Sequence, residues 1–108
     1  MEQLSITEKD GANYKMYELE GALNAYTIGE FQTVLYEAVT KYTVVLDMKG
    51  LIELDASGMG MLMAAFNDSD DSGHKLYFLQ LSNEAERAIA ATGFKYLINL
   101  INSVTEVA

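Results

Sequence analysis

Residues 44–62 decide the fold of this chain, and their sequence is VVLDMKGLIELDASGMGML. The run that begins just before them, at residues 42–48, is rich in β-branched and aromatic residues and is almost uninterrupted. Such a run is typical of a central strand that is covered on both faces of a sheet. We expect a short connector at residues 51–54, after which Ser57 opens a helix.

Two glycines, Gly58 and Gly60, follow Ser57 in the first turn of that helix. Each glycine destabilises a helix by about 1 kcal/mol relative to alanine. Their presence favours a site at which another molecule closely approaches the backbone or the Ser57 side chain. The alternative is structural: Ser57 serves only as a helix N-cap, and the glycines relieve crowding against the sheet.

The remaining elements alternate in type along the chain. We expect strands at residues 3–8, 13–19, 42–48 and 76–81, and helices at residues 28–40, 57–68 and 82–92. A turn at residues 9–11 makes the first two strands a hairpin, which Gly21 closes. Thr27 and Glu30 have the spacing of a capping box, and Ser82 can cap the third helix. An apolar tail at residues 94–101 can add a short edge strand, and a last capping box at residues 103–106 opens a further helix.

The order of these elements predicts one α/β domain over residues 1–108. Strands that alternate with helices form a mixed, mainly parallel sheet with helices packed on it. We therefore expect roughly four to five strands and about four helices.

The composition excludes several classes of function. The chain has 16 acidic and 7 basic residues and a net charge of −9, which would repel the backbone of a nucleic acid. Cysteine is absent, which rules out disulfides, thiolate zinc sites and a cysteine nucleophile, and the single histidine rules out a mechanism that needs two imidazoles. No apolar run approaches the roughly 20 residues that span a bilayer, and the first residues lack the plan of a signal peptide. We expect a cytoplasmic protein without membrane insertion.

Two further groups of residues could carry chemistry but have simpler interpretations. Asp47 and Asp55 could form a carboxylate pair for Mg²⁺, but the first strand lacks an acid pair, so we interpret Asp47 as a residue at a strand end. Met59 and Met63 have the spacing of core residues, whereas Met61 would point outward as an adaptable contact for a partner. We therefore expect no metal, no cofactor and no catalytic residue.

The central stretch resembles the signature of the STAS domain, in particular that of bacterial anti-sigma factor antagonists. The matching segments are LDM at residues 46–48 and LDASGMG at residues 54–60. Residues 20–24 and the helix through residues 84–94 are also similar to family segments. The resemblance covers nearly the whole chain in the right order and implies a STAS-like fold.

The resemblance implies that Ser57 is the phosphoacceptor, because it is the serine immediately before the first glycine of the motif. This chain departs from the family pattern at two positions. Ala56 stands where a serine is usual, so one hydroxyl remains at the motif. Asn24 stands where an aspartate is usual. That aspartate lies near the phosphoacceptor in relatives, so the resemblance implies that its replacement alters kinase recognition or the response to phosphate.

The function that the resemblance implies is that of a non-enzymatic partner switch. With Ser57 unphosphorylated, the chain would bind an anti-sigma factor with serine kinase activity, and phosphorylation would release it. A PP2C-type phosphatase would restore the first state. Loops gather at the carboxyl ends of parallel strands, where partner sites are usual. The expected contact residues lie there: Leu23, Asn24, Ala25, Asp55, Ala56, Gly58, Met59, Gly60 and Met61.

Two other functions remain open at this point. A STAS module could serve a transporter-associated or stressosome-like complex. A small α/β enzyme or nucleotide-binding protein could use the turn at residues 58–60 to hold phosphate, but the chain lacks a P-loop lysine and a full GxGxxG motif. The sequence indicates no oligomeric state.

Overall fold

One five-stranded sheet organises the computed structural model, which describes residues 3–107. Its strands are β1 (Leu4–Asp10), β2 (Lys15–Leu23), β3 (Val44–Leu54), β4 (Leu76–Leu79) and β5 (Asn99–Ile101). They lie in the order β1-β2-β3-β4-β5, with β1 antiparallel to β2 and all other neighbours parallel. The predicted mixed, mainly parallel sheet is confirmed.

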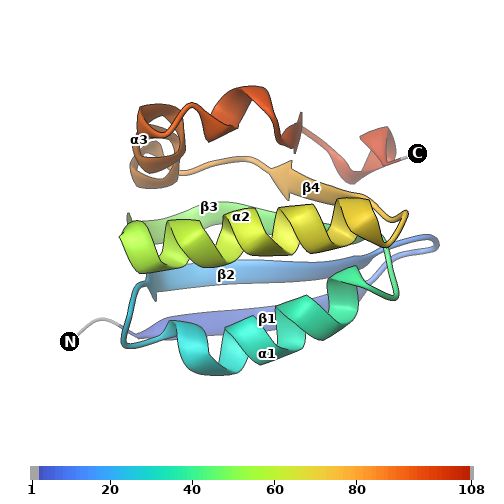
Figure 1. The fold of residues 1–108 in the computed structure, drawn as a ribbon, viewed down its shortest axis with the longest axis horizontal. Coiled ribbons are helices and arrows are strands. Elements are labelled where there is room, and N and C mark those ends of the chain that lie inside the picture. The colour runs from blue at the N-terminus through green and yellow to red at the C-terminus, as the bar shows by residue number, and fades with distance from the viewer. Residues whose placement is uncertain (1–2, 108) are drawn as a thin grey trace.

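Three α-helices connect the parallel strands: α1 (Ile28–Val39), α2 (Ala56–Asp71) and α3 (Asn83–Ala91). Each helix joins a parallel strand to its next neighbour in the sheet, always in the same direction across the sheet. Because such crossovers are right-handed, all three helices lie on one face of the sheet. Figure 1 shows α1 and α2 side by side in front of the strands. The described residues contain three α-helices rather than about four. The capping box at Ser103 and Glu106 is present but opens only the 3-10 helix η2 (Val104–Glu106), because Val107 is already extended.

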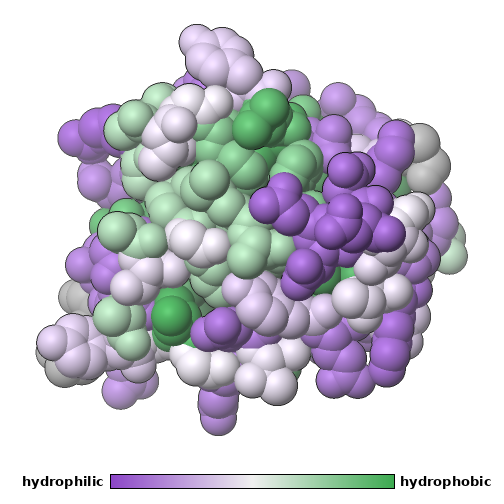
Figure 2. Space-filling model, viewed as in Figure 1, coloured by the Kyte–Doolittle hydropathy of each residue, from purple (hydrophilic) through white to green (hydrophobic). Residues whose placement is uncertain are grey.

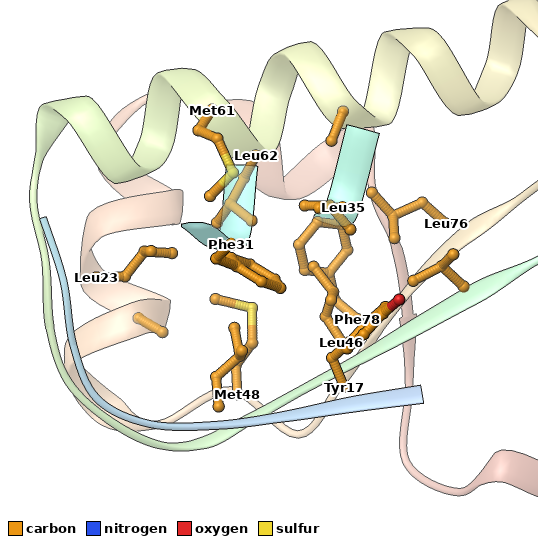
Figure 3. Packing of buried hydrophobic residues seen from close by; sticks show 14 of the residues in the cluster. Tyr17, Leu23, Phe31, Leu35, Leu46, Met48, Met61, Leu62, Leu76 and Phe78 are labelled. Carbon is orange, nitrogen blue, oxygen red and sulfur yellow. The ribbon is translucent and has the colours of Figure 1, made fainter. Parts of the chain in front are cut away.

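The main core lies between this helical layer and the sheet (Figure 3). Side chains alternate along a strand, so Val44, Leu46 and Met48 of β3 face the helices, and all three are fully buried. Val45 faces the opposite side, where a smaller cluster contains Tyr77, Leu79 and Ile101. The prediction that this strand is covered on both faces is therefore confirmed.

The predicted connector at residues 51–54 is wrong, because β3 continues through it. Leu51 is buried and pairs with Gly21, and the last residue of β3, Leu54, pairs with Leu23. The hairpin also does not close at Gly21. This residue has a φ of +98° and lies at an irregularity in the pairing with β3, which lets β2 bend and continue to Leu23. Both strands thus end side by side.

The 3-10 helix η1 (Phe94–Tyr96) follows α3 and leads into β5. The predicted cap at Ser82 is confirmed, since its hydroxyl accepts a hydrogen bond from the Ala85 amide at 3.1 Å. Within residues 3–107, no helix is both long and apolar enough to cross a membrane.

Candidate phosphorylation and docking site

The candidate site lies at the carboxyl ends of β2 and β3. The backbone amide of Asp55 donates to the Leu23 carbonyl at 3.3 Å, which continues the strand pairing to the start of α2. The loop of residues 24–27 therefore lies against the first turn of α2. This edge of a parallel sheet is where ligand and partner sites usually occur.

Asp55 holds the loop and the helix together. One carboxylate oxygen, Oδ1, accepts a hydrogen bond from the Gly58 amide at 2.8 Å, so Asp55 is the N-cap of α2. The other, Oδ2, accepts from the Ala25 amide across the gap at 3.1 Å. Hydrogen bonds to an ionised acceptor are about twice as strong as neutral ones. A single carboxylate thus fixes the position of α2 relative to the loop.

The loop itself is stiffened by Asn24, which is buried. The Nδ2 atom of the Asn24 side chain donates to Oε1 of Glu53 at 2.8 Å, and the Oδ1 atom of the same side chain accepts from the Tyr26 backbone amide at 2.9 Å. An aspartate here would have no hydrogen to donate and would face the Glu53 carboxylate directly. Sequence reasoning missed the role of Glu53, because nothing local marks a contact between residues 29 positions apart.

Thr27 locks the other end of the loop, and the predicted capping box is wrong. The Thr27 hydroxyl accepts from the Asn24 amide at 3.0 Å and donates to the Ala22 carbonyl at 2.8 Å. It makes no cap hydrogen bond to α1. The tertiary contacts of the loop have replaced the local contact that the Thr27 and Glu30 spacing predicts.

Ser57 is exposed and is the second residue of α2. The hypothesis that it is merely the N-cap is wrong, because Asp55 occupies that position. Within the described part of the chain, the Ser57 hydroxyl has no hydrogen-bond partner. The hydroxyl therefore has no structural task and is accessible to another protein.

We expect Ser57→Ala to change the free energy of unfolding by no more than about 0.5 kcal/mol, the usual range for a surface position. Asp55→Ala should cost about 1–2 kcal/mol, because the first turn of α2 loses its cap. Urea denaturation of both variants and the wild type measures the difference. A larger loss for Ser57→Ala than for Asp55→Ala would contradict these roles.

The two glycines of the motif have different surroundings. A Cβ atom at Gly58 would lie 2.7 Å from the Leu23 carbonyl oxygen and 2.8 Å from Cδ1 of Leu54. At Gly60 a Cβ atom would meet nothing within 4 Å. The crowding interpretation is thus confirmed for Gly58, whereas the packing of this chain does not require Gly60.

The predicted orientation of the methionines is partly wrong. Met59 is buried as expected, but Met61 is only 4% exposed, and the exposed methionine is Met63, at 36%. Figure 3 shows Met61 and Leu62 pointing from α2 into the core. The physical reason is that α2 packs against α1 as well as the sheet: the Tyr36 hydroxyl donates to the Met61 carbonyl at 3.5 Å. Met61 is therefore not available as an outward contact.

The structure gathers the expected contact residues around Ser57 but exposes only some of them. Ala25, Ala56 and Gly60 are exposed, and Asp55 is half-buried. The buried members of the set support the surface from below: Leu23, Asn24, Gly58, Met59 and Met61.

A hydrophobic surface adjoins Ser57. Figure 2 shows hydrophobic residues over the amino-terminal half of α2 and over the region between α2, α3 and η1. Hydrophilic residues gather instead over the carboxyl end of α2. Exposed apolar residues on these elements include Met63 on α2 and Leu97 just after η1. An apolar surface with a polar border is typical of protein interaction sites.

Asp47 and Asp55 do not form a carboxylate pair. Asp47 lies within β3 rather than at its end, so about eight residues of extended chain, or about 25 Å, separate it from Asp55. The buried Asp47 carboxylate instead accepts from the Lys49 Nζ atom at 2.6 Å. This hydrogen bond raises the pKa of the Lys49 ammonium.

Comparisons with known proteins agree with the fold. The family model of the STAS domain matches residues 3–107. An anti-sigma factor antagonist from Mycobacterium paratuberculosis superposes with a TM-score of 0.83 at 14% identity, covering 95% of this chain and 89% of that one.

Two further solved structures are similar. The anti-sigma factor antagonist SpoIIAA in its unphosphorylated form has a TM-score of 0.76 at 13% identity, covering 92% of this chain and 90% of that one. An anti-sigma-factor antagonist (STAS) domain protein from Planctomyces limnophilus has a TM-score of 0.76 at 10% identity, covering 96% and 93%. At such identities these structures establish the shared fold. The family match over residues 3–107 shows that this chain belongs to the STAS domain family.

Proposed function

We propose that this chain is a non-enzymatic anti-sigma factor antagonist whose partner binding is controlled by phosphorylation of Ser57. The observation that carries the proposal is the exposed Ser57 hydroxyl without a hydrogen-bond partner among the described residues, at the start of a firmly anchored helix. Ser57 also occupies the phosphoacceptor position of the motif that this chain shares with its family. The similar structures that are named as anti-sigma factor antagonists support the same role.

The electrostatics of the site suit a switch that acts on the surface. A phosphate on Ser57 would add a charge of about −1.5 to −2. The amino terminus of the 16-residue helix α2 tolerates an anion, so the fold can remain unchanged. Glu53, Asp55 and a chain charge of −9 already make the surroundings negative. The added charge therefore changes what a partner meets rather than how this chain folds.

The partner in this proposal is an anti-sigma factor with serine kinase activity. It binds the unphosphorylated chain through the surface formed by Ser57, Ala56, Gly60 and the exposed loop residue Ala25. The kinase supplies ATP and Mg²⁺, and this chain supplies the hydroxyl. A PP2C-type phosphatase restores the unphosphorylated state.

The test uses the kinase-type anti-sigma factors encoded in the same genome, each purified and incubated with this chain and ATP. We expect one of them to phosphorylate the wild type at Ser57 and to leave Ser57→Ala unmodified, as read by peptide mass spectrometry. Ser72→Ala is the matched control, because Ser72 is an exposed serine at the other end of α2. Phosphate on Ser72 or Thr27 with Ser57 unmodified would contradict the proposal. Neither binding nor phosphate transfer with any of these anti-sigma factors would instead favour a STAS module of another complex.

Asn24→Asp should destabilise the chain by about 1–3 kcal/mol, because the buried side chain loses its donor to Glu53 and a second carboxylate takes its place. Glu53→Gln in the same chain should recover most of this loss, since the glutamine amide can donate to the aspartate. A double-mutant cycle in urea measures the coupling. Equal stability of the wild type and Asn24→Asp would show that the Asn24 contact with Glu53 does not hold the loop.

A further inference from the structure

The first strand of the sheet, β1, has an open edge, because among residues 3–107 β2 is its only neighbouring strand. The Ala22 amide donates to the Gln3 carbonyl at 3.1 Å, and the Gly11 amide donates to the Tyr14 carbonyl at 2.9 Å. In an antiparallel pair, residues that form backbone hydrogen bonds with the partner strand alternate with residues whose backbone N–H and C=O groups point away from that strand. The backbone groups of Ile6 and Glu8 therefore face the open edge.

A groove runs beside this edge, between β1 and α1, which Figure 1 shows lying along each other. It contains a cavity of about 530 Å³ lined by Ile6, Glu8, Tyr17, Glu30, Thr33 and Val34. Ile6 is 37% exposed and Val34 is 42% exposed, so the groove presents apolar surface. A second cavity of about 270 Å³ shares Ile6 and Glu30 and extends the groove to Tyr26.

The charge of the groove indicates what it can accept. The described residues that line the 530 Å³ cavity include two carboxylates, those of Glu8 and Glu30, and no basic residue. The Glu8 carboxylate forms an ion pair with the Lys15 ammonium, with 2.9 Å between Oε2 and Nζ, whereas Glu30 has no ion pair among residues 3–107. Pairing two copies of this chain through β1 would bring together two chains of charge −9 and their carboxylates. A basic partner is therefore favoured over a second copy.

We propose that this groove binds an extended peptide segment of another protein, which adds to β1 as a further strand. Its backbone hydrogen-bonds to Ile6 and Glu8, an apolar side chain packs on Ile6 and Val34, and a lysine or arginine on the same face reaches Glu30. Strand addition combines backbone affinity with side-chain specificity in this way. This surface goes beyond the proposed function and does not depend on Ser57.

The test uses a blocked synthetic peptide, acetyl-TVTKTVT-amide, and amide hydrogen exchange of the whole chain followed by NMR. Without peptide, the Ile6 and Glu8 amides should exchange quickly, whereas those of Ser5 and Thr7 should be protected by β2. With peptide, exchange at Ile6 and Glu8 should slow at least about tenfold. A peptide with glutamate in place of lysine should bind about tenfold more weakly. A peptide N-methylated on its bonding edge should not bind.

Variants of the chain separate this proposal from its rivals. Glu30→Lys should reverse the preference between the lysine and glutamate peptides, and Ser57→Asp should leave both affinities unchanged. Unchanged exchange at Ile6 and Glu8 with the lysine peptide would overturn the proposal, as would equal binding of both peptides. Concentration-dependent protection of these amides without peptide would assign the edge to a second copy and would overturn it too.

Discussion

Gly58→Ala should lower the free energy of unfolding by about 2 kcal/mol, the middle of the range for overpacking a well-packed site. The new Cβ atom would lie 2.7 Å from the Leu23 carbonyl oxygen, which is backbone and cannot rotate away. Relief requires α2 to move from β2, which also strains the two hydrogen bonds of Asp55 to Gly58 and Ala25. Urea denaturation monitored by circular dichroism measures the loss.

Gly60→Ala is the matched control, because it makes the same chemical change two positions along the same helix. Its Cβ atom would lie in open space, so alanine should stabilise the chain by about 0.5–1 kcal/mol. We also expect Gly60→Ala to lower the affinity for the proposed partner about tenfold, because the partner packs closely beside Ser57. Equal stability changes for the two alanine variants would contradict the different surroundings of the glycines.

The order of elements and the sheet type could be predicted from sequence because they follow from local patterns. The apolar run at residues 42–48 marks the buried strand, and Ser82 marks the start of α3. Strand ends could not be predicted in the same way. Gly21 and Gly50 are typical of turns, yet here both lie within strands, and Gly50 pairs with Glu20. The pairing of β2 with β3 across an irregular register lets both strands continue past these glycines.

Tertiary contacts determine which of two nearby residues caps a helix or is buried, where the local sequence suits both. Asp55 and Ser57 are both good N-cap residues, and the local sequence does not distinguish them. Asp55 caps α2 and also accepts a hydrogen bond from the Ala25 amide of the adjacent loop, so its carboxylate makes both a local and a tertiary contact. Met61 and Met63 present the same problem. Met61 is buried where α2 packs against α1 and the sheet, and Met63 is the exposed one.

The resemblance to a family indicates the region of the candidate site but not the contacts that hold it together. The motif singles out Ser57, and the structure brings the loop of Asn24 and Ala25 next to it. The contact between Asn24 and Glu53 joins residues 29 positions apart, and no local pattern encodes it. Asn24 is thus a departure from the family pattern that this chain accommodates through a carboxylate on the neighbouring strand.

Phosphorylation of Ser57 should weaken binding of the proposed kinase-type partner by at least about 100-fold, which corresponds to about 2.7 kcal/mol. The reason is that the phosphate lies within the contact, where removing an unpaired charge from water costs several kcal/mol. Stability should change little, because the Ser57 hydroxyl makes no hydrogen bond within residues 3–107 and α2 keeps its cap at Asp55. Ser57→Asp should reproduce the loss in part, and Ser57→Ala should keep most of the affinity.

The control for net charge is Ser72→Asp, which adds the same charge as Ser57→Asp but places it on the exposed serine at the other end of α2. The two positions are separated by 15 residues, or about 22 Å of helix. Charges on a protein surface are screened over about 8 Å at physiological salt, so Ser72→Asp should leave the affinity nearly unchanged. Titration calorimetry of the variants and of enzymatically phosphorylated wild type gives the affinities, and thermal unfolding gives the stabilities. An equal loss for Ser57→Asp and Ser72→Asp would mean that overall charge, rather than a contact at Ser57, controls binding. Unchanged affinity of the phosphorylated chain would mean that Ser57 lies outside the interface.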